Sequence, residues 1–282
     1  MDCFIESWQF LPARIDPVFF SIGPVRIMYY SLMYIVAFAC TYILVLVRIR
    51  REDFDYTPET IQNIFVWAIL GLLIGARLGY VLFYNLDFYI HRPWAVLFPF
   101  EFHDGVRFVG IRGMSYHGGL AGVVVAALVF CRRHSISFRR FADLFCSVIP
   151  LGYTFGRIGN FINGELYGRV TDVPWGMYFP LDVSHQLRHP SQLYEAFGEG
   201  IVLFLVLWSL RKWRPFPGYL LGLYLIGYGV ARYCIEFTRE PDPQLGFVIA
   251  SQTMGQVLCL LMILCGMGLL GAFYLSARRE PA

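Results

Sequence analysis

The sequence predicts an all-α polytopic membrane protein in which seven transmembrane helices carry a small extracytoplasmic cap. Three observations support this fold class. Of the 282 residues, 57% are hydrophobic and only 15% are charged, whereas soluble domains carry about 25% charged residues. The apolar residues gather in stretches long enough to cross a bilayer. The arginines between these stretches are unevenly distributed, as in membrane proteins with a fixed orientation.

The seven predicted spans follow from the roughly 20 residues that a helix needs to cross the hydrocarbon core. They are 27–47, 61–84, 114–131, 142–163, 192–210, 218–236 and 252–276. We expect residues 1–282 to form a single integral-membrane domain. The segments 85–113 and 164–190 are rich in Pro, Gly and aromatic residues, so we expect them to form the extracytoplasmic cap from short strands or interfacial helices.

The basic residues between the spans predict the orientation. Short segments on one side collect Arg48, Arg50, Arg51, Arg132, Arg133, Arg139, Arg140, Arg211, Lys212, Arg214, Arg278 and Arg279. On the other side the basic residues are fewer and spread over longer segments. Because short basic segments stay in the cytoplasm, the N-terminus is expected outside and the C-terminus in the cytoplasm. The formal net charge of +3 is too small to suggest a nucleic-acid partner.

Residues 1–14 lack a basic region followed by an apolar stretch, so no cleaved signal peptide is expected. The 7 cysteines lie mostly inside apolar runs without a Cys-x-x-Cys spacing, and we interpret them as small residues of the membrane core. Glycines recur at every fourth position in four pairs or triplets: Gly71, Gly75 and Gly79; Gly118 and Gly122; Gly152 and Gly156; Gly218 and Gly222. This spacing predicts close helix packing.

Polar residues gather where the predicted spans reach the outer side. The fourth span ends with Arg157, Asn160, Asn163 and Glu165, and the sixth ends near Arg232, Glu236 and Arg239. The third span opens with residues 115–119, which include His117; Tyr30 of the first span and His189 before the fifth are expected at the same height. Residues three or four apart share a helix face, so each group can act together.

Each group also has a purely structural explanation. Arg232 and Glu236 can neutralise each other as an i, i+4 pair, and Arg157 can reach lipid headgroups from its helix end. His117 can be an ordinary hydrogen-bonding residue, and Asn160 can hold two helices together. Glu195 and Glu199 of the fifth span and Arg77 of the second are interpreted as ion-pair or interface residues.

These structural explanations are less convincing when the groups are considered together, because the groups converge on one membrane face. Arginines beside amides and a histidine suit an anion, and the planar guanidinium binds phosphate oxygens in pairs. At membrane height the available anion is a phospholipid headgroup. The chemistry suggested is displacement at a carbon next to a phosphate, with arginines stabilising the departing phosphate and a His or Tyr helping to deprotonate the nucleophile. No metal-ligand spacing is visible, and this reaction needs no cofactor.

The run 156–169, GRIGNFINGELYGR, closely resembles the signature of the bacterial prolipoprotein diacylglyceryl transferases. Further matches occur in the family's order over roughly residues 17–275: SIGP at 21–24, YSLMY at 30–34, GARLGYVLFYN at 75–85, MSYHGG at 114–119, HPSQLYE at 189–195 and RYCIEFTREPD at 232–242. The sequence departs from the commonest pattern at Tyr167, Tyr116 and Ser31, where tryptophan, phenylalanine and glycine are usual.

The resemblance implies a multi-pass enzyme of the bacterial plasma (inner) membrane whose site opens to the extracytoplasmic leaflet. Such an enzyme would transfer the diacylglyceryl group of phosphatidylglycerol to the thiol of the lipobox cysteine in a prolipoprotein signal peptide. A thioether would form and glycerol phosphate would leave, as the first step of lipoprotein maturation. Its partners would be these two substrates and the lipid bilayer, without a cofactor.

The resemblance also implies roles for particular residues. The family's essential arginines fall at Arg157 and Arg232, and two further catalytic positions fall at His117 and Tyr30. His117 is the candidate base, although an arginine–tyrosine arrangement could serve instead. The implied substrate-binding positions are Asn160, Glu165, Gly168, Glu236, Arg239 and His189.

Two rival functions remain open at this level. A transporter or scramblase of anionic lipid would also place arginines in a membrane cavity, but repeats and polar residues near the bilayer midplane would be typical of it. A non-catalytic assembly factor is the third possibility, and nothing in the sequence requires it.

Overall fold

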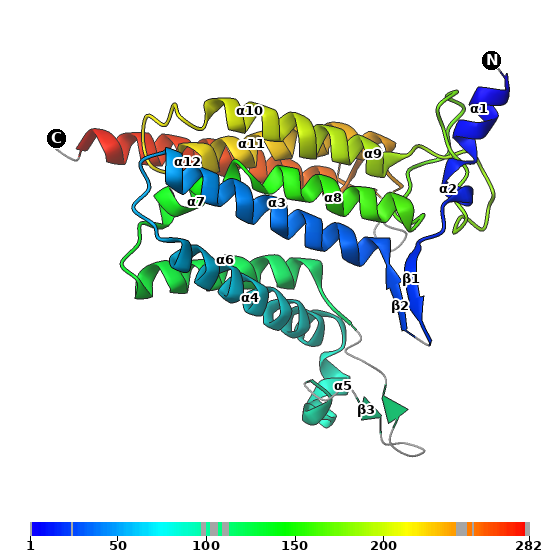
Figure 1. Ribbon diagram of the computed structural model, residues 1–282, viewed down its shortest axis with the longest axis horizontal. Helices are drawn as coiled ribbons and strands as arrows, with labels where there is room; N and C mark the ends of the chain where they lie inside the picture. The colour runs from blue at the N-terminus through cyan, green and yellow to red at the C-terminus, as the bar shows by residue number, and fades with distance from the viewer. Residues whose placement is uncertain are drawn as a thin grey trace. The chain divides into compact units, whose positions relative to one another are not determined.

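The computed structural model describes residues 2–23, 25–96, 100–101, 107–108, 113–240, 247–249 and 251–279 (Figure 1). It divides into two compact units. The large unit consists of Met1–Asp53 and Ala142–Ala282, and the small unit of Phe54–Phe141. The single domain expected over residues 1–282 stays a prediction.

The large unit begins with two short helices and a hairpin: α1 (Asp2–Gln9), α2 (Leu11–Arg14), β1 (Val18–Ile22) and β2 (Val25–Met28). Its remaining elements are α3 (Tyr29–Arg51), most of α7 (Phe138–Cys146), α8 (Ile149–Ile162), α9 (Ser191–Glu195), η2 (Ala196–Val202), α10 (Leu203–Leu210), α11 (Tyr219–Ile235), η3 (Glu236–Thr238), β5 (Phe247–Ile249), β6 (Gln252–Thr253) and α12 (Met254–Arg279). Its long helices α3, α8, α10, α11 and α12 lie alongside one another (Figure 1).

The small unit is a helix pair with a short irregular extension. It contains α4 (Pro58–Tyr84), α5 (Leu86–His91), η1 (Pro93–Val96), β3 (Phe100–Glu101), β4 (Arg107–Phe108) and α6 (Tyr116–Arg133). The Thr57 side chain caps the start of α4, and that of Ser115 caps the start of α6. Part of the predicted cap segment 85–113 lies outside the described residues.

Glycines bring α4 and α6 into close contact, as their spacing predicts. A Cβ atom at Gly75 would overlap the carbonyl oxygen of Gly118 and lie 2.7 Å from the Cα of Gly122. In the large unit, Gly152 packs in the same way against Thr41 of α3. The packing prediction was wrong for Gly156, because a Cβ there would meet no described atom within 4 Å.

Five helical runs among the described residues are long and apolar enough to cross a membrane, which identifies a polytopic membrane protein. They are Tyr29–Arg51, Pro58–Tyr84, Ser191–Leu210, Tyr219–Thr238 and Met254–Arg279. They correspond to five of the seven predicted spans. The other two correspond to α6 and to the pair α7 and α8, so seven spans and their orientation stay predictions.

The predicted fourth span, 142–163, is wrong as a continuous helix. It is divided at Ser147 and Val148 into α7 and the 14-residue helix α8, which has Pro150 in its first turn. The buried Arg48 side chain stabilises this break, because its Nη1 donates to the carbonyl oxygens of Asp143 (2.8 Å) and Leu144 (2.7 Å). The same nitrogen donates to Ser147 Oγ at 2.7 Å. Carbonyls at the end of α7 thus find a side-chain partner in place of a continuing helix.

Segment 164–190 of the large unit folds against the N-terminal helices. The Trp8 indole donates to the carbonyl oxygen of Trp175 at 3.0 Å, and the Phe10 ring stacks on Tyr178. Within the segment, Asp182 accepts from Arg188 Nε at 2.8 Å. Burial alone would raise the pKa of Asp182, but hydrogen bonds from Arg188 and from a neighbouring serine hold it below its ordinary value. The carboxylate therefore stays ionised and fixes this segment.

We expect Gly75→Ala to destabilise the protein by about 1–3 kcal/mol, because the added methyl group forces the backbones of α4 and α6 apart. Thermal unfolding of the detergent-solubilised protein measures the effect. The matched control is Gly268→Ala in α12, where a Cβ meets no described atom within 4 Å. There the better helix propensity of alanine should leave the melting temperature unchanged or raised. Equal stability of the two variants would contradict the packing role of Gly75.

Candidate functional site

One buried carboxylate, that of Glu195, holds three arginines of the large unit. Arg157 of α8 places Nε 2.6 Å from Glu195 Oε2, and Arg232 of α11 places Nη1 3.1 Å from the same oxygen. Arg239, which follows η3, donates through Nη1 to the other oxygen, Oε1. The Glu195 side chain has no exposed surface, whereas the arginine side chains are 16–17% exposed. We call Arg157, Arg232 and Arg239 the arginine cluster.

The predicted grouping of Arg157 with two amides and a carboxylate is confirmed as a chain of hydrogen bonds. Arg157 Nη1 donates to Asn160 Oδ1 at 3.1 Å. The Asn160 amide in turn donates to Glu165 Oε1 at 2.8 Å, and Asn163 approaches the same oxygen at 3.4 Å. Asn160 is buried. These contacts orient the Arg157 guanidinium through a second nitrogen, in addition to the Nε that contacts Glu195.

The stripe of Arg232, Glu236 and Arg239 is also confirmed. Glu236 Oε2 lies 3.2 Å from Arg232 Nη2 and 3.3 Å from Arg239 Nε. Its other oxygen accepts from Thr253 Oγ1 at 3.0 Å. A Cβ at Gly255 would lie 2.5 Å from that oxygen, so only glycine lets the start of α12 approach Glu236 this closely. Glu236 therefore neutralises Arg232, as expected, and also links it to Arg239.

Tyr153 and Glu199 also contact residues of the arginine cluster, and sequence analysis did not assign them to the site. The Tyr153 hydroxyl accepts from Arg157 Nε at 2.7 Å, donates to Glu199 Oε2 at 2.6 Å and lies 3.1 Å from Glu195 Oε2. Glu199 is fully buried, and its other oxygen is 3.6 Å from Arg232 Nη1. The interpretation of Glu195 and Glu199 as ion-pair residues is confirmed. Their position four residues apart in an apolar span was the available signal, whereas Tyr153 offered none.

The backbone positions Glu195 and Glu199 through an unusual helical turn. Residues 196–202 form a π-helical segment, η2, which frequently occurs at functional sites. A Cβ at Gly200 would overlap Thr154 Oγ1 of α8, so glycine lets η2 approach α8 closely. The helix that carries Glu195 is tied at its start by the Gln192 amide, which donates to the carbonyl oxygen of Glu165 at 2.6 Å.

Gly168 and His189 lie where three segments meet beside the cluster. The Gly168 N–H donates to the carbonyl oxygen of His189 at 2.8 Å, and Gly168 pairs with Arg239 as an antiparallel bridge. A Cβ at Gly168 would overlap the carbonyl oxygen of Thr238. His189 Nδ1 lies 3.3 Å from the Tyr194 hydroxyl, and burial lowers the pKa of His189, which favours a neutral imidazole. These two residues hold the backbone around Arg239.

The two remaining predicted catalytic residues lie in different units. Tyr30 belongs to α3, where its ring packs against Gly159 of α8 and its hydroxyl lies 3.0 Å from that of Tyr34. His117 belongs to the small unit, where it is exposed in the first turn of α6 beside Tyr116. The role of His117 as the base therefore stays a prediction.

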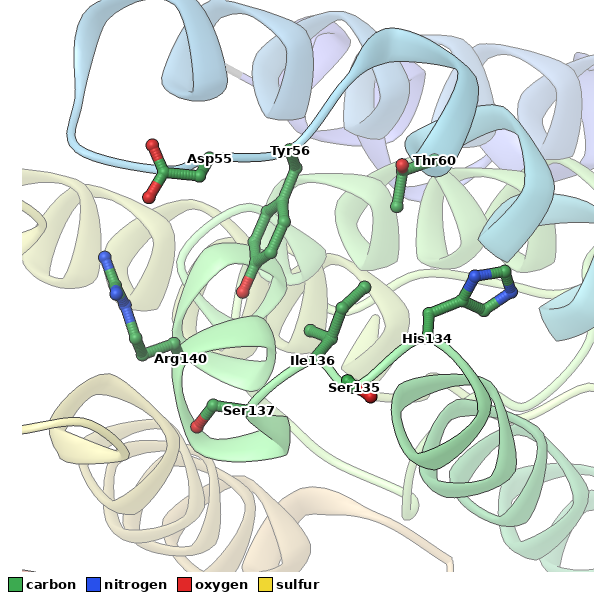
Figure 2. A pocket seen from close by; sticks show the side chains of 8 residues that line it. All are labelled: Asp55, Tyr56, Thr60, His134, Ser135, Ile136, Ser137 and Arg140. Carbon is green, nitrogen blue, oxygen red and sulfur yellow. The ribbon is translucent and has the colours of Figure 1, made fainter.

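A separate hollow of about 510 Å³ lies in the small unit (Figure 2). Its lining is polar and comes from the residues before and at the start of α4, the connection after α6 and the start of α7: Asp55, Tyr56, Thr60, His134, Ser135, Ile136, Ser137 and Arg140. In Figure 2 the Arg140 side chain extends towards Asp55 at one end of the hollow, and His134 lies at the opposite end. None of the predicted site residues lines this hollow, so it is distinct from the arginine cluster.

The arginine cluster suits a phosphate-bearing ligand. Three guanidinium groups from separate segments meet at one place and keep part of their surface exposed. Each is oriented by a carboxylate, so its remaining donors are preorganised towards an incoming anion. The cluster can thus bind phosphate oxygens and stabilise charge that develops on them during bond cleavage.

Comparisons with known proteins agree with this geometry. Residues 17–272 match the family model described as prolipoprotein diacylglyceryl transferase. The chain is 55% identical to the phosphatidylglycerol–prolipoprotein diacylglyceryl transferase of Chlorobaculum tepidum, over 95% of this chain and 93% of the relative. It is 44% identical to the protein of the same name from Wolinella succinogenes, over 91% and 92% of the two chains. The chain belongs to the prolipoprotein diacylglyceryl transferase family.

Proposed function

We propose that this membrane protein transfers the diacylglyceryl group of phosphatidylglycerol to the thiol of a lipobox cysteine in a prolipoprotein. The observation that carries the proposal is the meeting of Arg157, Arg232 and Arg239 on Glu195. The names of the relatives supply the two substrates, and the cluster supplies the phosphate chemistry. The reaction is the first step of bacterial lipoprotein maturation.

The reaction is a displacement at carbon. The cysteine sulfur forms a bond to the glycerol carbon that carries the phosphate, and the carbon–oxygen bond breaks. The electron pair stays on the phosphate oxygen, and the thiol proton passes to a base, for which His117 is the candidate. Arg157 and Arg232 hold the phosphate and stabilise the added charge as glycerol phosphate leaves. Tyr30 of α3, whose ring packs against Gly159 of α8, would lie beside the same site.

The other predicted residues support the arginines in this scheme. Asn160 and Glu165 orient Arg157 through their hydrogen bonds, and Glu236 orients Arg232 and Arg239. Gly168 and His189 keep the neighbouring backbone in place. These contacts favour roles in positioning and substrate binding.

The proposed setting is the bacterial inner membrane, crossed seven times, with the N-terminus outside. The uneven distribution of basic residues supports this orientation. This orientation would place the arginine cluster at the extracytoplasmic leaflet, where a lipobox peptide and phosphatidylglycerol can meet. Segment 164–190, packed on α1 and α2, would then cover the large unit on that side.

Reconstitution of the protein with phosphatidylglycerol and a lipobox peptide tests the proposed function. Mass spectrometry should show the gain of one diacylglyceryl group on the peptide, and a peptide with serine in place of the cysteine should gain nothing. Movement of fluorescent phosphatidylglycerol between leaflets without peptide modification would instead identify a lipid transporter.

We expect Arg157→Lys to lower the transfer rate by about a hundredfold or more, because removing one preorganised donor from such a site has effects of about 10²–10³. Lysine keeps the charge but cannot contact Glu195, Tyr153 and Asn160 at once. The matched control is Arg26→Lys, at an exposed position of β2 in the same unit, which should transfer at the wild-type rate. Near-normal transfer by Arg157→Lys would remove this arginine from the proposed mechanism.

A further inference from the structure

In the proposed reaction, on which this inference rests, the arginine cluster must release a product that carries more negative charge than the substrate. Its substrate is a phosphodiester with one negative charge, whereas the product is a phosphomonoester with a charge of roughly −1.5 to −2 at neutral pH. A site that stabilises the departing phosphate also binds the product, because both carry the additional charge. Three arginines without a counter-charge would hold glycerol phosphate strongly and slow its release.

Glu195 is the carboxylate in the right place to limit that affinity. It contacts all three arginines, whereas Glu236 contacts Arg232 and Arg239, and Glu199 forms an ion pair with Arg232. Because Glu195 has no exposed surface, solvent ions screen its charge much less than that of a surface carboxylate.

The same contacts make Glu195 a positioning residue. Its two oxygens hold guanidinium groups from α8, α11 and the segment after η3 in one arrangement. Gln192, three residues earlier, bonds the carbonyl oxygen of Glu165, whose carboxylate belongs to the hydrogen-bonded chain on Arg157. The position of Glu195 is therefore fixed by the same segment that orients Arg157.

We propose that Glu195 both positions the three arginines for transfer and weakens their hold on the phosphate product, so that the product leaves. Removing its charge then has two effects of opposite sign. Transfer slows because the arginines lose their common partner, and phosphate binds more tightly because the cluster gains one net positive charge. A purely structural role would weaken both properties together.

The test compares Glu195→Gln with wild type in two measurements on the purified full-length protein. Calorimetry with inorganic phosphate and with glycerol phosphate measures affinity, and the lipobox-peptide assay measures transfer. We expect affinity for both anions to rise about tenfold or more, since one unit charge a few ångströms away has a large effect at a partly buried site. Transfer should fall about tenfold or more, and glycerol phosphate should inhibit the remaining transfer more strongly.

Two variants separate charge from position. Glu195→Asp keeps the charge with a shorter side chain, so transfer should fall while phosphate affinity stays within about twofold of wild type. The control Glu52→Gln removes another buried carboxylate that faces three arginines, Arg48, Arg211 and Arg214, at the other end of α3. It should lower thermal stability and leave phosphate affinity unchanged.

A charge-balanced background keeps the proposal testable if Glu195→Gln does not fold. Arg239→Gln combined with Glu195→Gln removes both members of one pair and leaves no additional buried charge. This double variant should bind phosphate about tenfold more tightly than Arg239→Gln alone. If loss of the Glu195 charge leaves phosphate affinity equal or weaker in both backgrounds, the inference is overturned. A wild type that transfers no diacylglyceryl group overturns the proposed function instead.

Discussion

The large unit depends on one buried carboxylate and the arginines around it. Glu195 has no exposed surface, and an isolated carboxylate in such a place would be strongly destabilising. Arg157 and Arg232, which lie within apolar helices, would also be unfavourable there unless they were paired. The Glu195 carboxylate and the arginines therefore offset each other's cost of burial. For these contacts to form, α8, α9 and α11 must keep one relative position. Removing one partner would leave an uncompensated charge in the interior.

Glycines at specific positions let the backbones approach closely enough for these contacts. At Gly200 the π-helical turn meets Thr154 of α8, and at Gly168 the outer segment meets the carbonyl oxygen of Thr238. A methyl group at either position would separate the segments that carry the charged groups. In this protein the small residues therefore serve the electrostatics of the site as well as helix packing.

Sequence reasoning found the contacts within single helices and the convergence of the groups on one face, but it missed that Glu195 joins them. Arg157 with Asn160, and Arg232 with Glu236, are three or four residues apart on one helix, so their contacts follow from helix geometry. The bridge through Glu195 joins separate segments, and no spacing along the chain reveals it. The division of the predicted fourth span escaped notice for the same reason, because the Arg48 that stabilises it lies about a hundred residues earlier.

Comparison of the two arginine–carboxylate clusters shows which features indicate function. Glu52, like Glu195, faces three arginines and is almost completely buried. Its closest partner, Arg48, has no exposed side-chain surface, and its donors bond a carboxylate, two carbonyl oxygens and a hydroxyl, so little is left for a ligand. The arginines around Glu195 keep 16–17% of their side chains exposed. Convergence of charges alone therefore does not identify a phosphate site. Exposure alone does not identify one either, because Arg211 and Arg214 beside Glu52 keep 24% and 19% of their side chains exposed. The Glu195 cluster differs because all three of its arginines lie within 3.1 Å of the shared carboxylate, whereas Arg211 and Arg214 lie 3.4 and 3.9 Å from Glu52. Its arginines are thus both exposed and held in place for an incoming anion.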